Sequence, residues 1–227
     1  MSAHFITGTG TDIGKTWLVC ALLRNWRGES KSVAAYKPLL SGFDAQDPEA
    51  SDAGMLLAAM GREPSVPALD AIAPWRFAAP LSPDMAAAQE GRRIDFDELV
   101  GFTRRAASAD FERMLIEGVG GVMVPLDERH TVRDWIAASG LPCVLVAGSY
   151  LGSLSHTLTA LEALSKFPAG KQSTGVTAIA VNESPGSAVA LDATLESLSR
   201  HTASIPLVGI TRNSSEAGIA RLATLLY

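Results

Sequence analysis

Residues 5–16 read FITGTGTDIGKT, a strand-length apolar run that passes into a glycine-bearing loop and then into a helix opening with Lys15 and Thr16. Glycines let the backbone turn tightly and approach a ligand, and the free N–H groups at a helix N-terminus bind phosphate. A lysine adds a mobile positive charge, and a threonine hydroxyl can ligate Mg²⁺. The stretch therefore predicts a phosphate-binding loop between a strand and a helix.

The loop is a variant of the common pattern G-x-x-x-x-G-K-[ST]. Thr9 stands five residues before Gly14, and the nearest matching glycine, Gly8, stands six residues before it. A glycine-rich turn that binds nothing is the alternative, but a lysine and a threonine at the start of the helix favour binding. We expect the loop's nucleotide contacts to come from Gly10, Thr11, Asp12, Ile13, Gly14, Lys15 and Thr16.

Beyond the loop, apolar runs of strand length alternate with longer segments of helical period. This alternation predicts an α/β fold: a single doubly wound, mainly parallel sheet with helices on both faces, of the P-loop NTPase type. We expect one domain over residues 1–227, in which the proline-rich segment 61–83 is an irregular surface connection. The expected strands are 4–7, 32–36, 113–117, 142–147, 177–181 and 207–210, and the expected helices begin after residue 14 and near residues 52, 95, 131, 152, 188 and 216.

Composition narrows the possible functions. The chain has 227 residues, of which 47% are hydrophobic and 19% charged, an ordinary globular mixture. Its net charge of -5 argues against a general nucleic-acid binder, because phosphate backbones are held by clustered lysines and arginines. The sequence has no apolar run of about 18 residues and no signal-peptide pattern, so we expect no membrane segment and a cytoplasmic location. Cys20 and Cys143 lie in apolar runs and are expected to be buried thiols.

A second group of polar residues follows the predicted strands downstream. Lys37 comes directly after strand 32–36, at the sheet edge where ligands of open α/β folds bind. Asp52 begins a helix, and Glu117 ends a strand and precedes a glycine cluster. Taken singly, Lys37 fits a solvated lysine, and Asp52 fits an ordinary first-turn carboxylate. Beside a phosphate loop, the two carboxylates are natural ligands for a Mg²⁺ that bridges ATP phosphates.

Together these segments resemble the dethiobiotin synthetase family, ATP-dependent carboxylases that close the ureido ring in biotin synthesis. The family's variant loop, G-T-x-T-x-x-G-K-T, matches residues 8–16, and its K-P-x-x-S-G segment matches residues 37–42. Its E-G-x-G-G-x-x-V-P-L segment matches residues 117–126, and its metal-binding aspartate corresponds to Asp52. The likeness runs to about Gly209, and the combination is far more specific than either motif alone.

The resemblance implies a reaction and its participants. CO2 would carboxylate one amine of 7,8-diaminopelargonic acid, ATP would phosphorylate the carbamate, and the second amine would close the ring and release phosphate. Lys15, Lys37 and Thr11 would be catalytic, and Ser41 would bind substrate together with Lys37. The implied cofactors are ATP and Mg²⁺.

The resemblance also implies contacts outside the loop. A homodimer is implied, in which Gly152 and Ser153 at the start of a helix bind the substrate carboxylate of the partner's site. Leucines at helical spacing between residues 151 and 164 are then either core or subunit interface. The metal would be held by Thr16, Asp52 and Glu117, and the nucleotide would be contacted by Glu117, Asn182, Pro206 and Leu207.

Four positions depart from the family pattern. The aspartate often found in the loop is Gly10, and the S-P-H segment is replaced by residues 82–84, which read SPD. A frequent lysine is Tyr150, and an asparagine is Ser155 just before His156. These changes bear on the pocket for the substrate carboxylate more than on the phosphate chemistry.

Three alternatives remain open at this point. A partitioning-type P-loop switch ATPase would carry a signature lysine four residues before the last glycine of the loop, where this chain has Gly10. An amidotransferase of the cobyrinic acid type would need a further glutaminase domain, for which 227 residues leave no expected room. A paralogue acting on a different substrate would turn over ATP without forming dethiobiotin.

Overall fold

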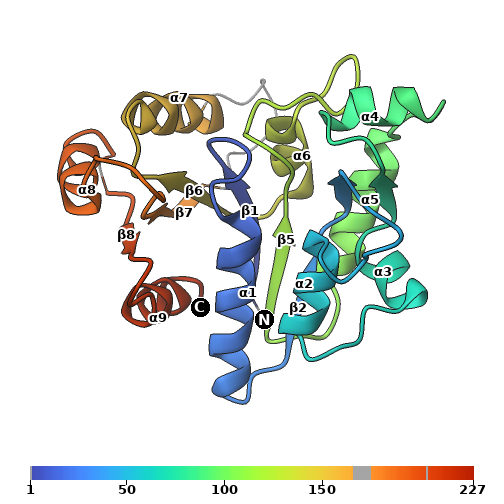
Figure 1. The fold of residues 1–227 in the computed structure, drawn as a ribbon, viewed down its shortest axis with the longest axis horizontal. Coiled ribbons are helices and arrows are strands. Elements are labelled where there is room, and N and C mark those ends of the chain that lie inside the picture. The colour runs from blue at the N-terminus through green and yellow to red at the C-terminus, as the bar shows by residue number, and fades with distance from the viewer. Residues whose placement is uncertain (1, 166–174, 203) are drawn as a thin grey trace.

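The strand that carries the phosphate loop, β1 (Ser2–Gly8), lies inside a six-stranded sheet of order β2-β5-β1-β6-β7-β8. The computed structural model describes residues 2–165, 175–202 and 204–227, and Figure 1 shows its arrangement. Every neighbouring pair in this sheet is parallel. The other strands of the sheet are β2 (Val33–Tyr36), β5 (Arg113–Glu117), β6 (Cys143–Gly148), β7 (Val176–Asn182) and β8 (Leu207–Ile210).

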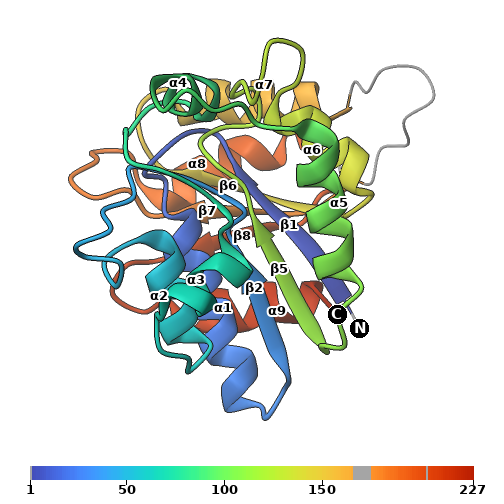
Figure 2. The same cartoon turned by 90° about the vertical axis from the view of Figure 1, so that its right-hand side faces the viewer.

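Helices cover both faces of the sheet, and each face has its own apolar core. Successive strand residues point to opposite faces, so Ile6 packs into one core and Phe5 into the other, both fully buried. Figure 2 shows α1 and α2 on one side of the strands and α5 and α6 on the other. The first core is built on α1 (Lys15–Gly28), α2 (Asp52–Ala59), α3 (Val66–Ile72) and α9 (Glu216–Leu225), and the second on α4 (Pro83–Gln89), α5 (Phe96–Ala107), α6 (Val132–Ser139), α7 (Ser153–Ser165) and α8 (Leu191–Ser199).

The expected fold class is confirmed, and each expected strand and helix is found to within a few residues. The expectation for segment 61–83 is wrong. This segment forms α3 and a short strand, β4 (Trp75–Phe77), which pairs in parallel with β3 (Leu39–Ser41) as a small second sheet. The Ser65 hydroxyl caps α3 by accepting from the Ala68 N–H, and Pro67 lies in the first turn, where no N–H is needed. Pro67 therefore lies at the start of a helix and not in an irregular loop.

Both cysteines are buried and free, as expected, Cys20 in α1 and Cys143 in β6. No helix in the described ranges combines the length and apolarity needed to cross a bilayer.

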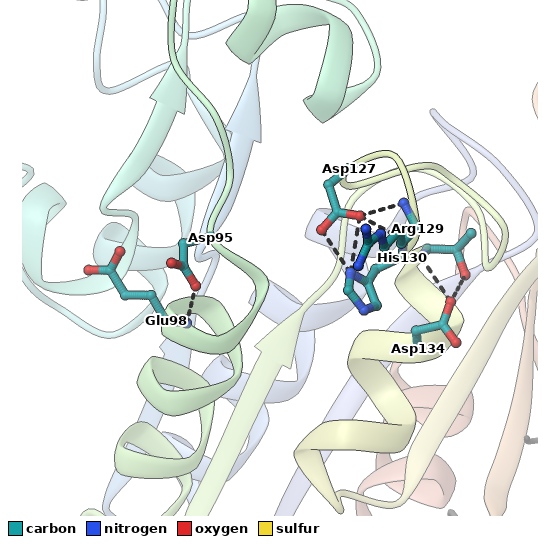
Figure 3. A network of polar contacts seen from close by, with 7 residues as sticks. Asp95, Glu98, Asp127, Arg129, His130 and Asp134 are labelled. Carbon is teal, nitrogen blue, oxygen red and sulfur yellow. Dashed lines mark hydrogen bonds and ion pairs between the residues drawn. The ribbon is translucent and has the colours of Figure 1, made fainter. Parts of the chain in front are cut away.

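A polar loop joins β5 to α6, and its last turn is drawn in Figure 3. Asp127 Oδ2 lies 2.8 Å from His130 Nδ1, and Asp127 Oδ1 accepts hydrogen bonds from the backbone N–H groups of Arg129 and His130. Asp134 caps α6 by accepting from the Thr131 N–H at 2.9 Å. These contacts fix the loop at the end farther from Glu117.

The two ends of the chain meet near the amino ends of the strands. The Ser2 hydroxyl donates to the Leu226 carbonyl at 2.7 Å, and the Arg113 guanidinium lies 3.9 Å from the centre of the Tyr227 ring. His4 of β1 is 6% exposed in this region. Burial, followed by the nearby charge of Arg113, lowers the pKa of His4 to about 4.

Candidate active site

The loop between β1 and α1 has a backbone conformation and close contacts that depend on its glycines. Gly14 has φ +88°, and a Cβ there would lie 2.6 Å from Asn182 Nδ2. A Cβ at Gly8 would lie 2.5 Å from the Ile13 side chain. Asp12 also has a positive φ, of 56°. The positive φ of Gly14 therefore requires glycine there, and a side chain at Gly8 would displace the end of the Ile13 side chain, as expected for a backbone that wraps a phosphate.

Neighbouring strands and their loops fix the phosphate loop in place. The Thr9 N–H donates to the Val146 carbonyl at 2.9 Å, and the Val122 N–H donates to the Gly8 carbonyl at 3.1 Å. On the far side, Asn182 Nδ2 donates to the Ile13 carbonyl at 2.7 Å. The loop is thus held by β6, by the β5–α6 loop and by the end of β7.

A buried charge cluster lies beside the loop. Lys37, which follows β2 and is 3% exposed, places Nζ 2.6 Å from Glu117 Oε1 and 3.1 Å from Asp52 Oδ2. Its Nζ also donates to the Gly118 carbonyl at 2.9 Å. The Thr16 hydroxyl donates to the same Glu117 oxygen at 2.7 Å. Residues from four separate parts of the chain therefore converge at the carboxyl edge of the sheet.

The electrostatics of the site favour the charged forms of Lys37 and Asp52 and disfavour the charged form of Lys15. Burial opposes charge on Lys37, but Glu117 and then Asp52 outweigh it and raise the pKa of Lys37. Burial likewise opposes charge on Asp52, but Lys37 lowers the pKa of that carboxyl below its usual value. Lys15, whose Nζ donates to the Gly10 carbonyl at 2.7 Å, has a pKa lowered to about 8 by burial and then by Lys37.

The cluster opens into a cavity of about 980 Å³. The Ser41 hydroxyl lies at this cavity, and its oxygen is buried with no hydrogen-bond partner among the described residues. An unpaired buried oxygen of this kind is available to a ligand. The structure thus brings most of the sequence-predicted residues to one cavity: Thr11, Asp12, Gly14, Lys15, Thr16, Lys37, Ser41, Asp52 and Glu117.

A smaller cleft of about 280 Å³ lies on the other side of the loop. Asn182 at the end of β7 lines it, and Asn182 Oδ1 is buried without a partner in the described chain. Pro206 and Leu207, expected beside Asn182, are not among its lining residues. Leu207 pairs with Ile179, three residues before Asn182, which places it about 10 Å down the sheet. The residues that follow β8 take this place instead, Thr211 and Arg212.

Gly152 and Ser153 lie apart from both cavities. Gly152 has φ +99° just before α7, and the Ser153 oxygen is buried with no partner in the part of the chain that is described. Beside them, the Tyr150 hydroxyl lies 2.9 Å from His156 Nδ1, and Leu151 is 92% exposed. The structure of one chain therefore does not join these residues to Lys37.

The oxygen atoms of the cluster fit a magnesium ion that is also held by a nucleotide. The described residues contain no group of three or more His, Cys, Asp or Glu that could hold a metal by themselves. Mg²⁺ in nucleotide sites is bound through one or two carboxylates plus phosphates and waters. Asp52, Glu117 and the Thr16 hydroxyl supply such a partial set, and Glu117 Oε2 is buried without a partner in the described ranges.

Some residues of the site escape sequence reasoning. Gly118 contributes only a carbonyl, which no motif predicts. Trp17, next to Thr16 and 40% exposed, lines both cavities. Thr211 and Arg212 could have been found by asking which residues follow the carboxyl end of β8, because ligands of open sheets bind there.

A strand, a glycine-bearing loop and a helix N-terminus arranged around Lys15 and Thr16 define the class of P-loop nucleotide-binding proteins. Solved structures agree with this fold. The chain is similar to a ParA family ATPase from Chlorobium tepidum with a TM-score of 0.53 and 15% identity, over 99% of this chain and 93% of that one. It is also similar to chloroplast FtsY from Physcomitrella patens, with a TM-score of 0.56 and 16% identity, over 100% of this chain and 65% of that one.

Sequence comparison narrows the class to a family. A family model described as "AAA domain" matches residues 2–216. The chain is 48% identical to the ATP-dependent dethiobiotin synthetase BioD of Acidiphilium cryptum over 91% of both chains. It is 41% identical to the protein of the same name from Phenylobacterium zucineum, over 100% of this chain and 95% of the relative. The chain belongs to the dethiobiotin synthetase family.

Proposed function

We propose that this protein closes the ureido ring of dethiobiotin at the expense of ATP. CO2 carboxylates one amine of 7,8-diaminopelargonic acid, and a carbamate oxygen takes the γ-phosphoryl group of ATP. The second amine then attacks the carbonyl carbon, and the C–O bond to phosphate breaks, which gives dethiobiotin, ADP and phosphate. The observation that carries the proposal is the convergence of Lys15, Lys37, Thr16, Asp52 and Glu117 on one cavity at the carboxyl edge of the sheet.

The two lysines have separate tasks in this proposal. Lys15 is the first residue of α1. Its ammonium would bind the nucleotide phosphates once it releases its hydrogen bond to the Gly10 carbonyl. Lys37 would stabilise the negative charge on the carbamate, because its ammonium is already desolvated and fixed at the cavity wall. Thr11 and Ser41 line the same cavity and would hydrogen-bond the carbamate or the diamine.

Asp52, Glu117 and Thr16 would hold Mg²⁺. When bound, that ion neutralises charge on the phosphate oxygens during transfer. Asp52 is the first residue of α2, and Glu117 is the last residue of β5. These two rigid elements therefore fix the separation of the two carboxylates.

Asn182 would contact the nucleotide base. Its Nδ2 is committed to the Ile13 carbonyl, while its Oδ1 is an unpaired acceptor in the smaller cleft. A base with an exocyclic amino donor, such as adenine, satisfies that acceptor. Thr211 and Arg212 would close the cleft from the β8 side in place of Pro206 and Leu207.

The reaction is tested with the purified protein, Mg-ATP and bicarbonate, with and without 7,8-diaminopelargonic acid. We expect phosphate release that depends on the diamine and matches dethiobiotin formed, as measured by mass spectrometry. ATP turnover that ignores the diamine and yields no dethiobiotin would favour a switch ATPase or a paralogue with another substrate.

We further propose that the protein works as a homodimer in the cytoplasm. The leucines of the α7 region differ in exposure. Leu164 is buried in the second core, whereas Leu151 is 92% exposed and Leu154 is 37% exposed. The exposed leucines leave apolar surface for a partner. Free buried thiols at Cys20 and Cys143 suit a reducing compartment. Sedimentation equilibrium of the wild type and of Leu151→Asp tests the dimer, which the substitution should weaken, and cell fractionation tests the location.

A further inference from the structure

One oxygen of each carboxylate proposed for the metal already contacts Lys37 within the protein. Glu117 Oε1 accepts from Lys37 Nζ at 2.6 Å and from the Thr16 hydroxyl at 2.7 Å. Asp52 Oδ2 lies 3.1 Å from the same ammonium. One ammonium therefore contacts both carboxylates and offsets one of their two negative charges at the position where a divalent cation would bind them.

The ammonium and a metal ion would be held by the same two carboxylates. Mg²⁺ binds oxygen ligands at about 2.0–2.1 Å, so a metal on Glu117, whose Oε2 has no partner in the described ranges, would lie close to the ammonium held at Oε1. Lys37 is 3% exposed, and repulsion between two cations is weakly screened at such a depth. Repulsion from a metal on Glu117 and Asp52 therefore favours departure of the Lys37 ammonium from the two carboxylates.

The structure offers the ammonium a path toward the substrate. Nζ also donates to the Gly118 carbonyl at 2.9 Å, a contact that does not involve either metal ligand. Lys37 itself lines the large cavity, where the Ser41 oxygen is buried without a partner among the described residues. Release from Glu117 and Asp52 would leave Nζ free to move within this cavity, which the proposed function assigns to the carbamate.

We infer that Lys37 is the resident counter-cation of the metal site and that metal bound with nucleotide displaces its ammonium toward the substrate. The carbamate part of this inference rests on the proposed function, whereas the exchange of ammonium for metal does not. Metal binding and the delivery of Lys37 to the reacting group are then one event. In the absence of nucleotide, Lys37 keeps the carboxylates satisfied and the affinity for free metal low.

Manganese binding to the nucleotide-free protein tests the exchange. Free Mn²⁺ is counted by electron paramagnetic resonance during titration of the wild type and of Lys37→Met, which removes the charge and keeps most of the side-chain volume. We expect Lys37→Met to bind Mn²⁺ at least about tenfold more tightly, because two carboxylates lose their competing cation. Lys31→Met, which removes a lysine paired with Glu112 at the surface, is the matched control and should bind like the wild type.

The gained affinity must depend on Glu117. The double variant Lys37→Met/Glu117→Gln should return to the wild-type affinity, since it lacks the carboxylate on which the metal would bind. Equal Mn²⁺ affinity in the wild type and Lys37→Met would overturn the inference. A gain that survives in the double variant would overturn it as well.

A second measurement keeps the inference testable if Lys37→Met does not fold. The ε-methylene NMR signals of Lys37 in the wild type, assigned with Lys37→Arg, should shift when Mg-ADP is added and stay in place when ADP is added with EDTA. The same shift under both conditions would overturn the exchange. Neither measurement requires dethiobiotin to be formed, so failure of the exchange and failure of the proposed function are separate results.

Discussion

Lys37 and His4 are buried to a similar degree near opposite ends of the strands in the same sheet, yet they reach opposite protonation states. Lys37, at the carboxyl edge, is 3% exposed, and Glu117 and Asp52 overcome burial to raise its pKa. His4, near the amino ends of the strands, is 6% exposed, and burial together with Arg113 lowers its pKa to about 4. Burial disfavours both charges, so the partners decide the outcome.

The difference shows that the Lys37 cluster bears on both the chemistry and the stability of the molecule, whereas His4 bears on its stability alone. A charge that is held in a dry place by two carboxylates is available to stabilise a transition state. A histidine held neutral beside an arginine packs the sheet near the chain ends and contributes nothing to the cavity. The predictions below act on one side of this contrast or the other.

Removing the negative charge of Glu117 has the largest expected effect. Glu117→Gln should lower the free energy of unfolding by about 4 kcal/mol, because the buried Lys37 loses its nearest counter-ion. Urea denaturation at pH 7 measures the loss. Glu112→Gln removes a partly exposed partner of Lys31 and should leave the free energy of unfolding close to the wild-type value, because solvent screens this surface pair. Equal losses in the two variants would show that burial of the Lys37 pair carries no energetic weight.

Acid should weaken the fold through His4. The unfolded state takes up a proton near pH 6.5, whereas the folded state does so only near pH 4. Since the unfolded state binds more protons in that window, the contribution of His4 is fully present above about pH 6.5 and is lost as the pH falls to about 4. The loss should amount to about 3 kcal/mol.

Denaturation series from pH 7 to pH 4 on the wild type and His4→Gln measure this loss by difference. The variant should show a flatter pH dependence, while His201→Gln, an exposed control, should follow the wild type. A wild-type slope in His4→Gln would remove His4 from the contrast.

Truncation of Lys37 should act on turnover. Lys37→Ala should lower kcat by roughly 10²-fold or more, the scale for loss of one preorganised charge stabiliser. Steady-state phosphate release with diamine, ATP and bicarbonate measures it. Lys31→Met should keep the wild-type rate, and near-normal turnover in Lys37→Ala would end the assignment of Lys37 to the carbamate.

A smaller effect is expected where the site meets the nucleotide base. Asn182→Ala loses the hydrogen bond to the Ile13 carbonyl and the free acceptor in the cleft, which should raise the KM for ATP by about tenfold with little change in kcat. Asn25→Ala, which removes an exposed amide from α1, is the control. A fall in kcat at unchanged KM would move Asn182 from base binding to the phosphate chemistry.

The sequence predicts the sheet and the phosphate loop because both follow from local patterns. Apolar runs buried on two faces identify the strands, and Gly14, Lys15 and Thr16 define the loop by spacing. The structure of segment 61–83 is harder to predict from sequence, since Pro67 is compatible with a helix start as well as with a loop. The cleft beside Asn182 depends on strand register, which places Leu207 near the start of β8 and away from this cleft, whereas Arg212 follows the end of β8 and lines it.

Lys37 shows the same limit within the site. Its motif predicts a lysine at the carboxyl edge, but its pairing with Glu117 and Asp52 joins residues that are far apart in the chain. Only the packing of α2 and β5 around β2 brings the three charges together.

Isotope transfer gives the most direct test of the proposed chemistry. Purified protein is incubated with Mg-ATP, 7,8-diaminopelargonic acid and ¹³C-bicarbonate, and the product and phosphate are counted in the same sample. We predict dethiobiotin whose mass is raised by the single labelled ureido carbon, in an amount equal to the phosphate released. Phosphate release without labelled dethiobiotin would contradict the assignment of this cavity to ring closure.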